Sequence, residues 1–354
     1  MDAYRVFISY ARKDLDLVRK IVRVLTKNGL RPMWDKDLTP GGGFDDQIKS
    51  FIMHADVFLP VITPEATARG WVHQEIGFAI AHRIPILPVC RGIRPDGFAM
   101  IERFQAIECG DDTRGLKTKL SQALISQLVK AAEYTRPLYE CAPSRSDRAK
   151  MLAEYATKVR DLGQYGMLRQ RGGLTTFNIP KNGIQNPIWK ERYGNVSRSD
   201  DDIAAIREER LALEEHAREA GCRLIIDTGN HFEEFGPNVR AIRIRCLLDF
   251  IDSMSEDKIR VAFTRNEMPE SVTIVGDWYY TESIRWTARR GLQNTVFTWH
   301  APTVRRRLRA FDQEFEEVSQ EPGNKSATTL EGAKQILRDI MNGTSLSTPT
   351  ATST

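Results

Sequence analysis

The feature that most constrains the fold is the run Asp56-Val57-Phe58-Leu59-Pro60-Val61-Ile62, in which every residue after the aspartate is apolar or proline. A strand that is apolar on both faces is typical of a parallel sheet covered by helices. Around this run, short apolar segments alternate with stretches of helical periodicity. Strands are predicted at 4–10, 31–34, 56–62 and 84–89, and helices at 15–25, 45–54, 71–82 and 114–132. The alternation predicts an α/β domain with helices on both faces of a parallel sheet.

The remaining chain predicts a second domain. A length of 354 residues is more than one ordinary core accommodates. Turn residues interrupt the pattern near Pro137 and Cys141-Ala142-Pro143-Ser144. We therefore predict a first domain at 1–135, a linker at 136–147, a second α/β or α+β domain at 148–320, and a short helix with a disordered Ser/Thr-rich tail at 321–354.

Composition narrows the class of protein. The hydrophobic fraction of 41% and charged fraction of 28% are those of a globular protein. The five cysteines are scattered and odd in number, which favours reduced thiols in a cytoplasm over disulfides or a zinc site. We expect no secretory leader, no membrane span and no metal. A net charge of +4 neither requires nor excludes a nucleic-acid partner.

One carboxylate stands out beside the predicted ligand-binding edge of the sheet. Ligands of open parallel sheets bind beyond the carboxyl ends of the strands, which here are followed by residues 10–14, 35–44 and 63–71. Glu75 lies one turn into the next helix and shares a face with Trp71. Such a glutamate is a candidate catalytic group, although the pattern alone also suits a solvated residue on an amphipathic helix.

Four segments in order carry a family resemblance. They are Val6-Phe7-Ile8-Ser9-Tyr10-Ala11-Arg12, Trp34-Asp35, Leu38-Thr39-Pro40-Gly41-Gly42-Gly43-Phe44 and Trp71-Val72-His73-Gln74-Glu75. Together they resemble a TIR (Toll/interleukin-1 receptor) domain, specifically of the bacterial branch that consumes NAD. The resemblance implies a flavodoxin-like parallel-sheet fold for the first domain.

The same resemblance implies an enzyme, an NAD+ glycohydrolase with NAD+ as substrate and no separate cofactor. Glu75 is the expected catalytic residue, and the expected substrate-binding residues are Tyr10, Arg12, Asp35, Phe44 and Trp71. Cleavage of the nicotinamide–ribose bond passes through a transition state like an oxocarbenium ion, which a carboxylate stabilises. Arg12 is expected to contact the pyrophosphate, and Phe44 to stack on a ring.

Structural roles without ligand binding are also open for three of these residues. Arg12 can be solvated, Phe44 can belong to the core, and Asp35 can cap a turn. For the whole protein, the resemblance implies oligomerisation through the TIR domains, a C-terminal sensor that switches the enzyme on, and a role in antiphage defence. The alternative is a TIR adaptor that binds other TIR domains without catalysis.

The second domain offers an arginine cluster. Its residues 271–283 and 295–318 resemble one lobe of a phospholipase D-like fold without the His-x-Lys pair of such enzymes. The predicted anion-binding residues are Arg285, Arg289, Arg290, Arg305, Arg306 and Arg307. They are candidates for a phosphate-bearing ligand or nucleic acid. A solvated basic face balanced by later glutamates is the alternative.

Overall fold

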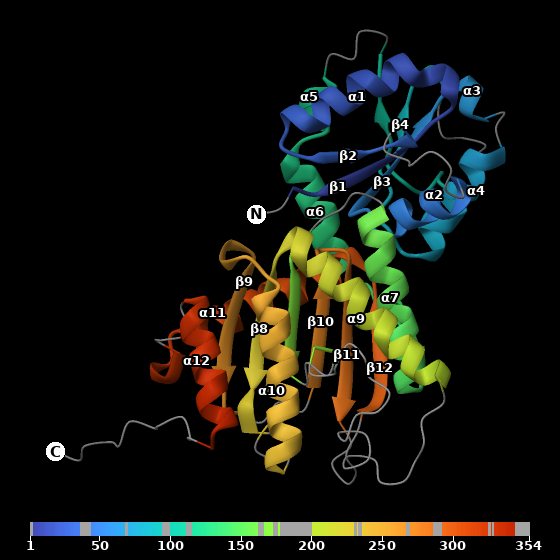
Figure 1. Cartoon of the computed structure of the whole chain (residues 1–354). Helices are drawn as coiled ribbons and strands as arrows, with labels where there is room; N and C mark the ends of the chain where they lie inside the picture. Colours follow the sequence, from blue (N-terminus) through green and yellow to red (C-terminus); the bar gives the residue numbers. More distant parts are fainter. Residues whose placement is uncertain are drawn as a thin grey trace. The chain divides into compact units, whose positions relative to one another are not determined.

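The computed structural model describes residues 3–35, 44–67, 70–93, 100–110, 115–161, 166–172, 176–177, 200–229, 232, 236–266, 270–285, 292–324, 327 and 329–343. The chain divides into two compact units (Figure 1). The first comprises Met1–Leu138 and Trp299–Thr303, and the second comprises Tyr139–Thr298 and Val304–Thr354.

The first unit contains the predicted parallel sheet, with strand order β2-β1-β3-β4-β5. Its strands are β1 (Arg5–Ser9), β2 (Arg31–Met33), β3 (Val57–Ile62), β4 (Val89–Cys90) and β5 (Ile107–Glu108). Its helices are α1 (Leu15–Lys27), α2 (Phe44–Met53), α3 (Pro64–Thr67), α4 (Gly70–Ala81), α5 (Leu116–Lys119) and α6 (Gln122–Glu133). All the strand pairs are parallel, which confirms the predicted α/β class.

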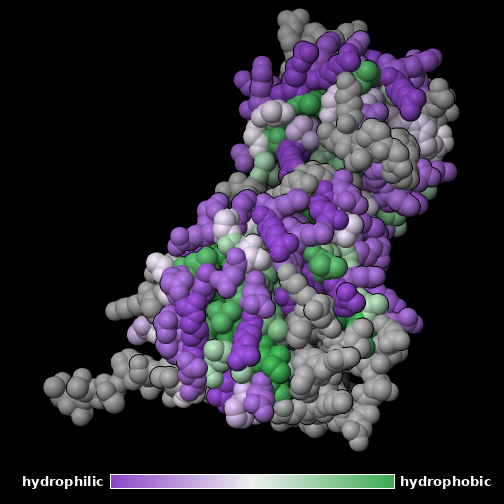
Figure 2. Space-filling model, viewed as in Figure 1, coloured by the Kyte–Doolittle hydropathy of each residue, from purple (hydrophilic) through white to green (hydrophobic). Residues whose placement is uncertain are grey.

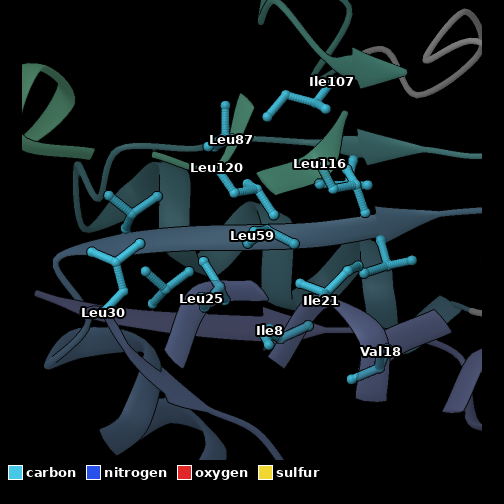
Figure 3. Packing of buried hydrophobic residues seen from close by; sticks show 14 of the residues in the cluster. Ile8, Val18, Ile21, Leu25, Leu30, Leu59, Leu87, Ile107, Leu116 and Leu120 are labelled. Atoms are coloured by element: carbon cyan, nitrogen blue, oxygen red, sulfur yellow. The ribbon is translucent and has the colours of Figure 1, made fainter. Parts of the chain in front are cut away.

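Alternation along β1 produces two different buried faces. Val6 and Ile8 point into a core with α1, α5 and α6, where Ile21, Leu59 and Leu120 pack together (Figure 3). Phe7 points to the other face, where its ring stacks on Phe51 of α2 at 6.3 Å between centroids. Every residue of β3 is buried, as the opening run predicts.

Two expectations for this unit were wrong in detail. The predicted strand 84–89 is mostly an extended approach to β4, joined to β3 by an isolated bridge between Phe58 and Ile86. The predicted helix 114–132 is two helices. The Ser121 side chain accepts a hydrogen bond from the Leu124 N–H and so begins α6 as a new helix. The short strand β5 was not predicted, because no apolar run in the sequence indicates it.

The second unit contains a mixed seven-stranded sheet in the order β6-β12-β11-β10-β7-β8-β9. Its strands are β6 (Glu140–Ala142), β7 (Leu168–Gly172), β8 (Cys222–Asp227), β9 (Ile259–Thr264), β10 (Glu270–Val275), β11 (Tyr279–Arg285) and β12 (Leu292–Thr298). Its long helices are α7 (Arg145–Asp161), α9 (Asp200–Ala220), α10 (Pro237–Asp252), α11 (Ala301–Ser319) and α12 (Leu330–Met341). The pairs β7–β8 and β8–β9 are parallel, and the others are antiparallel.

Helices cover both faces of this sheet. In Figure 1, α7, α9 and α10 lie across one face and α11 lies behind the other. On the α11 face, Phe311 and Phe315 pack on Ile225, Ile274 and Tyr280. On the visible surface, hydrophilic side chains predominate in both units, and apolar residues of the second unit show mainly between its helices (Figure 2). No helix in the described part of the chain is both long and apolar enough to cross a membrane.

Ionic groups are buried on the face of the second sheet that α7 and α9 cover, where a hydrophobic core is usual. Glu209 of α9 is fully buried and forms ion pairs with Arg148 at 2.8 Å and with Arg145 at 2.5 Å, both from α7. Arg148 also donates to the Ser283 hydroxyl of β11 at 3.2 Å. Thr176 donates a further hydrogen bond to Glu209 at 2.7 Å. This network ties two helices to the sheet.

Regular elements occur near the predicted domain boundaries. The segment 136–147 is not simply a linker, because it contains β6, which pairs with β12, and the beginning of α7. Strand β7 lies in a stretch that shows no clear period in the sequence. Helix α12 packs against α10 and β9, so it belongs to the second unit. The predicted disordered tail falls outside the described residues.

Candidate active site

The first unit has a cavity of about 620 Å³ at the carboxyl end of its sheet. Its walls come from the end of β1, the turn after it, the second residue after β2, and helices α2, α3 and α4. The lining residues are Phe7, Ile8, Ser9, Tyr10, Ala11, Arg12, Lys13, Asp35, Ile48, Glu65, Trp71 and Glu75. The volume lies in the range of small-molecule sites.

Glu75 occupies the inner face of α4. The buried residues of this helix are Val72, Glu75, Ile76 and Ala79, which follow the spacing of a core-facing stripe. Only 7% of Glu75 is exposed, and its buried Oε2 atom has no hydrogen-bond partner in the part of the chain that the structure describes. A carboxylate thus stands where the helix pattern calls for an apolar side chain.

Burial raises the pKa of Glu75 to about 7. The hydroxyl of Ser9 acts in the opposite direction and lowers this pKa, while the negative charges of Asp35 and Asp45 raise it further. Glu75 therefore changes its charge near neutral pH, in a cavity open to a ligand. Such a carboxyl group is a candidate for catalysis.

Tyr10 and Asp35 form a second pair in the cavity wall. The Tyr10 hydroxyl donates to Asp35 Oδ1 at 2.5 Å, and its ring lies 6.4 Å from that of Trp34. Burial, together with this hydrogen bond, raises the pKa of Tyr10 well above its usual value. The pair joins the segments that follow β1 and β2.

The cationic side of the cavity is a one-turn 3₁₀ helix, Arg12–Asp14, which is separated from β1 by Tyr10 and Ala11. Arg12 and Lys13 are exposed, whereas Asp14 is buried. Asp14 accepts a hydrogen bond from the Thr63 hydroxyl at 2.7 Å and lies 3.5 Å from an Arg91 nitrogen. Because Thr63 follows β3 and Arg91 follows β4, Asp14 fastens the basic turn to two neighbouring strand ends.

Most of the predicted site residues of the first domain are brought together. Tyr10, Arg12, Asp35, Trp71 and Glu75 all line the cavity. Trp71 is 37% exposed at its wall. Phe44 is the first residue of α2, but its side chain lies outside the described residues, as does the loop 36–43.

Sequence reasoning missed seven lining residues, Phe7, Ile8, Ser9, Ala11, Lys13, Ile48 and Glu65. The signal for Ser9 was present, because it is a hydroxyl at the end of an otherwise apolar strand. Glu65 lies within the segment 63–71, which already pointed to this edge. Ile48 has no such signal, since it reads as an ordinary core residue of an amphipathic helix.

The TIR domain family model matches residues 6–124, which include every described residue of the cavity. The first unit is a TIR domain. The match ends before the second unit, so the resemblance of that unit to a phospholipase D-like lobe stays a prediction. A search of curated proteins gives no match.

Solved structures similar to the chain include two TIR structures. The TIR domain of the Toll-related receptor TRR-2 from Hydra magnipapillata is 21% identical, with a TM-score of 0.30, over 36% of this chain and 98% of that one. The TIR domains of the activated Roq1 resistosome, which recognises the pathogen effector XopQ, are 17% identical, with a TM-score of 0.26, over 38% of this chain and 86% of that one. TrmBL2, an archaeal chromatin protein with a novel mode of DNA binding, is 12% identical, with a TM-score of 0.27, over 57% and 61%. Nothing about function follows from likenesses this low.

The arginine cluster of the second unit is partly neutralised. Arg305 of α11 lies 3.6 Å from Asp277, and Arg307 lies 3.2 Å from Glu282 and over the Tyr280 ring. Arg306 is exposed. Arg289 and Arg290 lie outside the described residues, as does the side chain of Arg285. The described members therefore form, in large part, a balanced surface.

Proposed function

We propose that the TIR domain is an NAD+ glycohydrolase that cleaves the nicotinamide–ribose bond, with Glu75 as the catalytic residue. The observation that carries the proposal is the buried Glu75 carboxyl group in the wall of a cavity of about 620 Å³, with its Oε2 atom lacking a hydrogen-bond partner among the described residues. An unpaired buried carboxylate costs folding free energy, so its position calls for a functional reason.

The arrangement of charges supports this reaction. The nicotinamide of NAD+ is already cationic and leaves without a strong acid. Positive charge then develops on the ribose, and the Glu75 carboxylate would stabilise it, with Asp35 in the same wall. Arg12 and Lys13 supply the cations that a pyrophosphate needs. The cavity wall thus offers carboxylates for the ribose and cations for the pyrophosphate of NAD+.

We further propose that self-association through the TIR domain activates the enzyme, and that the second unit is the sensor that controls it. The biological role would be innate immune defence against phage from the cytoplasm. These proposals follow from the family resemblance. The alternative is an adaptor that transmits a signal by binding other TIR domains.

The direct test is nicotinamide release from NAD+ by the purified full chain, alone and with lysate of phage-infected cells. The proposal expects NAD+ to fall and nicotinamide to rise in parallel in at least one condition. Folded protein that never releases nicotinamide, but still associates with itself, would favour the adaptor.

The pH dependence of the reaction is a separate prediction. Since the pKa of Glu75 is about 7 and the reaction needs its ionised form, kcat/KM should rise through pH 7 and level off above about pH 8. Below pH 6, the rate should fall roughly tenfold for each pH unit. Initial rates between pH 5 and 9, with circular dichroism as the control for folding, check this. A flat profile would argue against Glu75.

Replacing Arg12 tests the binding of pyrophosphate. Arg12→Ala should raise KM about tenfold and change kcat much less, because the lost contact is equally strong in the ground and transition states. Arg23→Ala is the matched control, since Arg23 is an exposed arginine on α1 outside the cavity. Equal kinetics for the two variants would remove Arg12 from the site.

A further inference from the structure

Two buried polar atoms in the cavity wall, Ser9 Oγ and Glu75 Oε2, form no hydrogen bond of standard geometry within the described structure. Only 2% of Ser9 is exposed. A hydroxyl can donate one hydrogen bond, and an ionised carboxylate can only accept. The two atoms are therefore chemically complementary, and leaving both unsatisfied is unfavourable.

The strand pattern directs the two side chains into the same space. Arg5, Phe7 and Ser9 alternate with Val6 and Ile8, so Ser9 shares the face of Phe7, which packs on α2. Glu75 lies on the inward stripe of α4, which contacts α2 and β3. The hydroxyl and the carboxyl group thus line one cavity from the sheet side and from the helix side.

We propose that Ser9 is a positioning residue, whose hydroxyl donates a hydrogen bond to the ionised carboxylate of Glu75 and fixes it for reaction. This role rests on the proposed NAD+ cleavage. The Ser9 hydroxyl can be aimed at the carboxylate by rotation about χ1 alone. The hydrogen bond that it donates is stronger when Glu75 is ionised. Ser9 would then favour the reactive form of Glu75 without touching the substrate.

The electrostatic surroundings agree with this role. Burial and the charges of Asp35 and Asp45 all raise the pKa of Glu75, and the Ser9 hydroxyl lowers it. The other charged or titratable groups in the cavity wall are Tyr10, Arg12, Lys13 and Glu65. Of these influences on the pKa of Glu75, the Ser9 hydroxyl is the one that counteracts burial.

The test is the titration of Glu75 in three variants of the full chain, Ser9→Ala, Ser9→Thr and the control Ser50→Ala. Ser50 is a buried serine of α2 whose hydroxyl donates to the Asp46 carbonyl, and it does not line the cavity. The carboxyl ¹³C shift of Glu75, assigned by its loss in Glu75→Gln, reports the pKa without any turnover. This measurement remains valid even if the chain does not cleave NAD+.

The proposal expects the Glu75 midpoint to rise by about one pH unit in Ser9→Ala, and to stay near the natural value in Ser9→Thr and Ser50→Ala. If NAD+ is cleaved, kcat at pH 7 should fall roughly five- to tenfold in Ser9→Ala with KM unchanged, and recover above pH 9. An unchanged midpoint would overturn the proposal. A rise in KM alone would also overturn it, because it would mean that Ser9 binds the substrate directly. If Ser9→Ala does not fold, an equal midpoint in Ser9→Thr and Ser9→Cys would overturn it, since a thiol is a much weaker donor.

Discussion

Glu75→Gln should lower nicotinamide release about 10²- to 10³-fold, the loss typical of removing one group that stabilises charge in a transition state. Glutamine keeps the shape of the side chain and one acceptor oxygen, but it replaces the other oxygen with an NH2 donor and cannot carry a negative charge. The loss should therefore appear in kcat, with a small change in KM. A coupled assay of nicotinamide or ADP-ribose, with NAD+ in excess, measures it.

The same substitution should stabilise the fold at alkaline pH. The pKa of Glu75 in the folded protein is about 7, above its value in the unfolded chain, so ionisation favours unfolding. The natural protein is fully stable with respect to this group below about pH 4.5, loses stability as the pH rises from there to about 7, and changes little above that. Glu75→Gln should remove that loss, which is on the order of 2–3 kcal/mol at pH 8.

Two controls separate chemistry from folding. Glu65→Gln changes another carboxylate of the cavity wall, one that is exposed on α3, and should retain most activity. A variant at Glu75 that is inactive and less stable at pH 8 would indicate a structural role. Full activity in Glu75→Gln would refute the assignment of the site.

The second large effect is expected at Glu209. Glu209→Ala removes the counter-charge of Arg148, which is buried, and of Arg145. Breaking a buried ion pair from one side typically costs about 3–5 kcal/mol, because a charge is left without compensation. That is a large share of the stability of an ordinary domain.

The direction of the Glu209 pKa shift agrees with a carboxylate that the two arginines stabilise. Burial alone would raise the pKa of Glu209, but the charges of Arg145 and Arg148, with the Thr176 hydrogen bond, hold it below its usual value. Glu209→Gln, which keeps the shape, should therefore lose nearly as much stability as Glu209→Ala. The charge, more than the volume, is what the arginines require.

Hydrogen exchange of the full chain can localise the loss. Faster exchange in β7, β10 and β11 of Glu209→Ala, with unchanged exchange in β1 and β3, is the expected pattern. Glu208→Ala is the matched control, because Glu208 is the exposed neighbour on the same helix and should change stability by less than about 0.5 kcal/mol. Equal protection in the two variants would contradict the role of the network.

The sequence predicted the first unit well, because its signals are local. The apolar run of β3 and the spacing of α4 depend only on neighbouring residues, and the parallel topology then follows from the order of the elements. That topology also brings Tyr10, Asp35 and Glu75 to one edge. Residues far apart in the chain could thus be grouped without any contact information.

The second unit was harder to predict because its strands look polar. In β7, Arg169 and Arg171 alternate with Leu168 and Gln170, and the arginines are satisfied by Asp312 and Glu314 of α11, more than 140 residues away. The acids that pair with Arg305 and Arg307 are Asp277 and Glu282, which lie on an earlier turn and strand and not on the same helix. Ion pairs between separate elements leave no periodic signal, so these pairings could not be predicted from the sequence, and the anion site stays a prediction.

Deamidation of Asn324 would change the hydrogen bonding at one edge of the second sheet. Its side-chain amide donates to the carbonyl oxygens of Phe263 and Val318 at 2.7 and 2.8 Å, and its Oδ1 accepts the Phe263 N–H at 2.7 Å. Phe263 belongs to β9, an edge strand of the sheet, so this one side chain occupies the backbone groups through which another chain would add a strand. Deamidation would replace the donor with a carboxylate facing two carbonyl oxygens. The backbone groups of Phe263 would then lose their hydrogen-bond partner at this edge of the sheet.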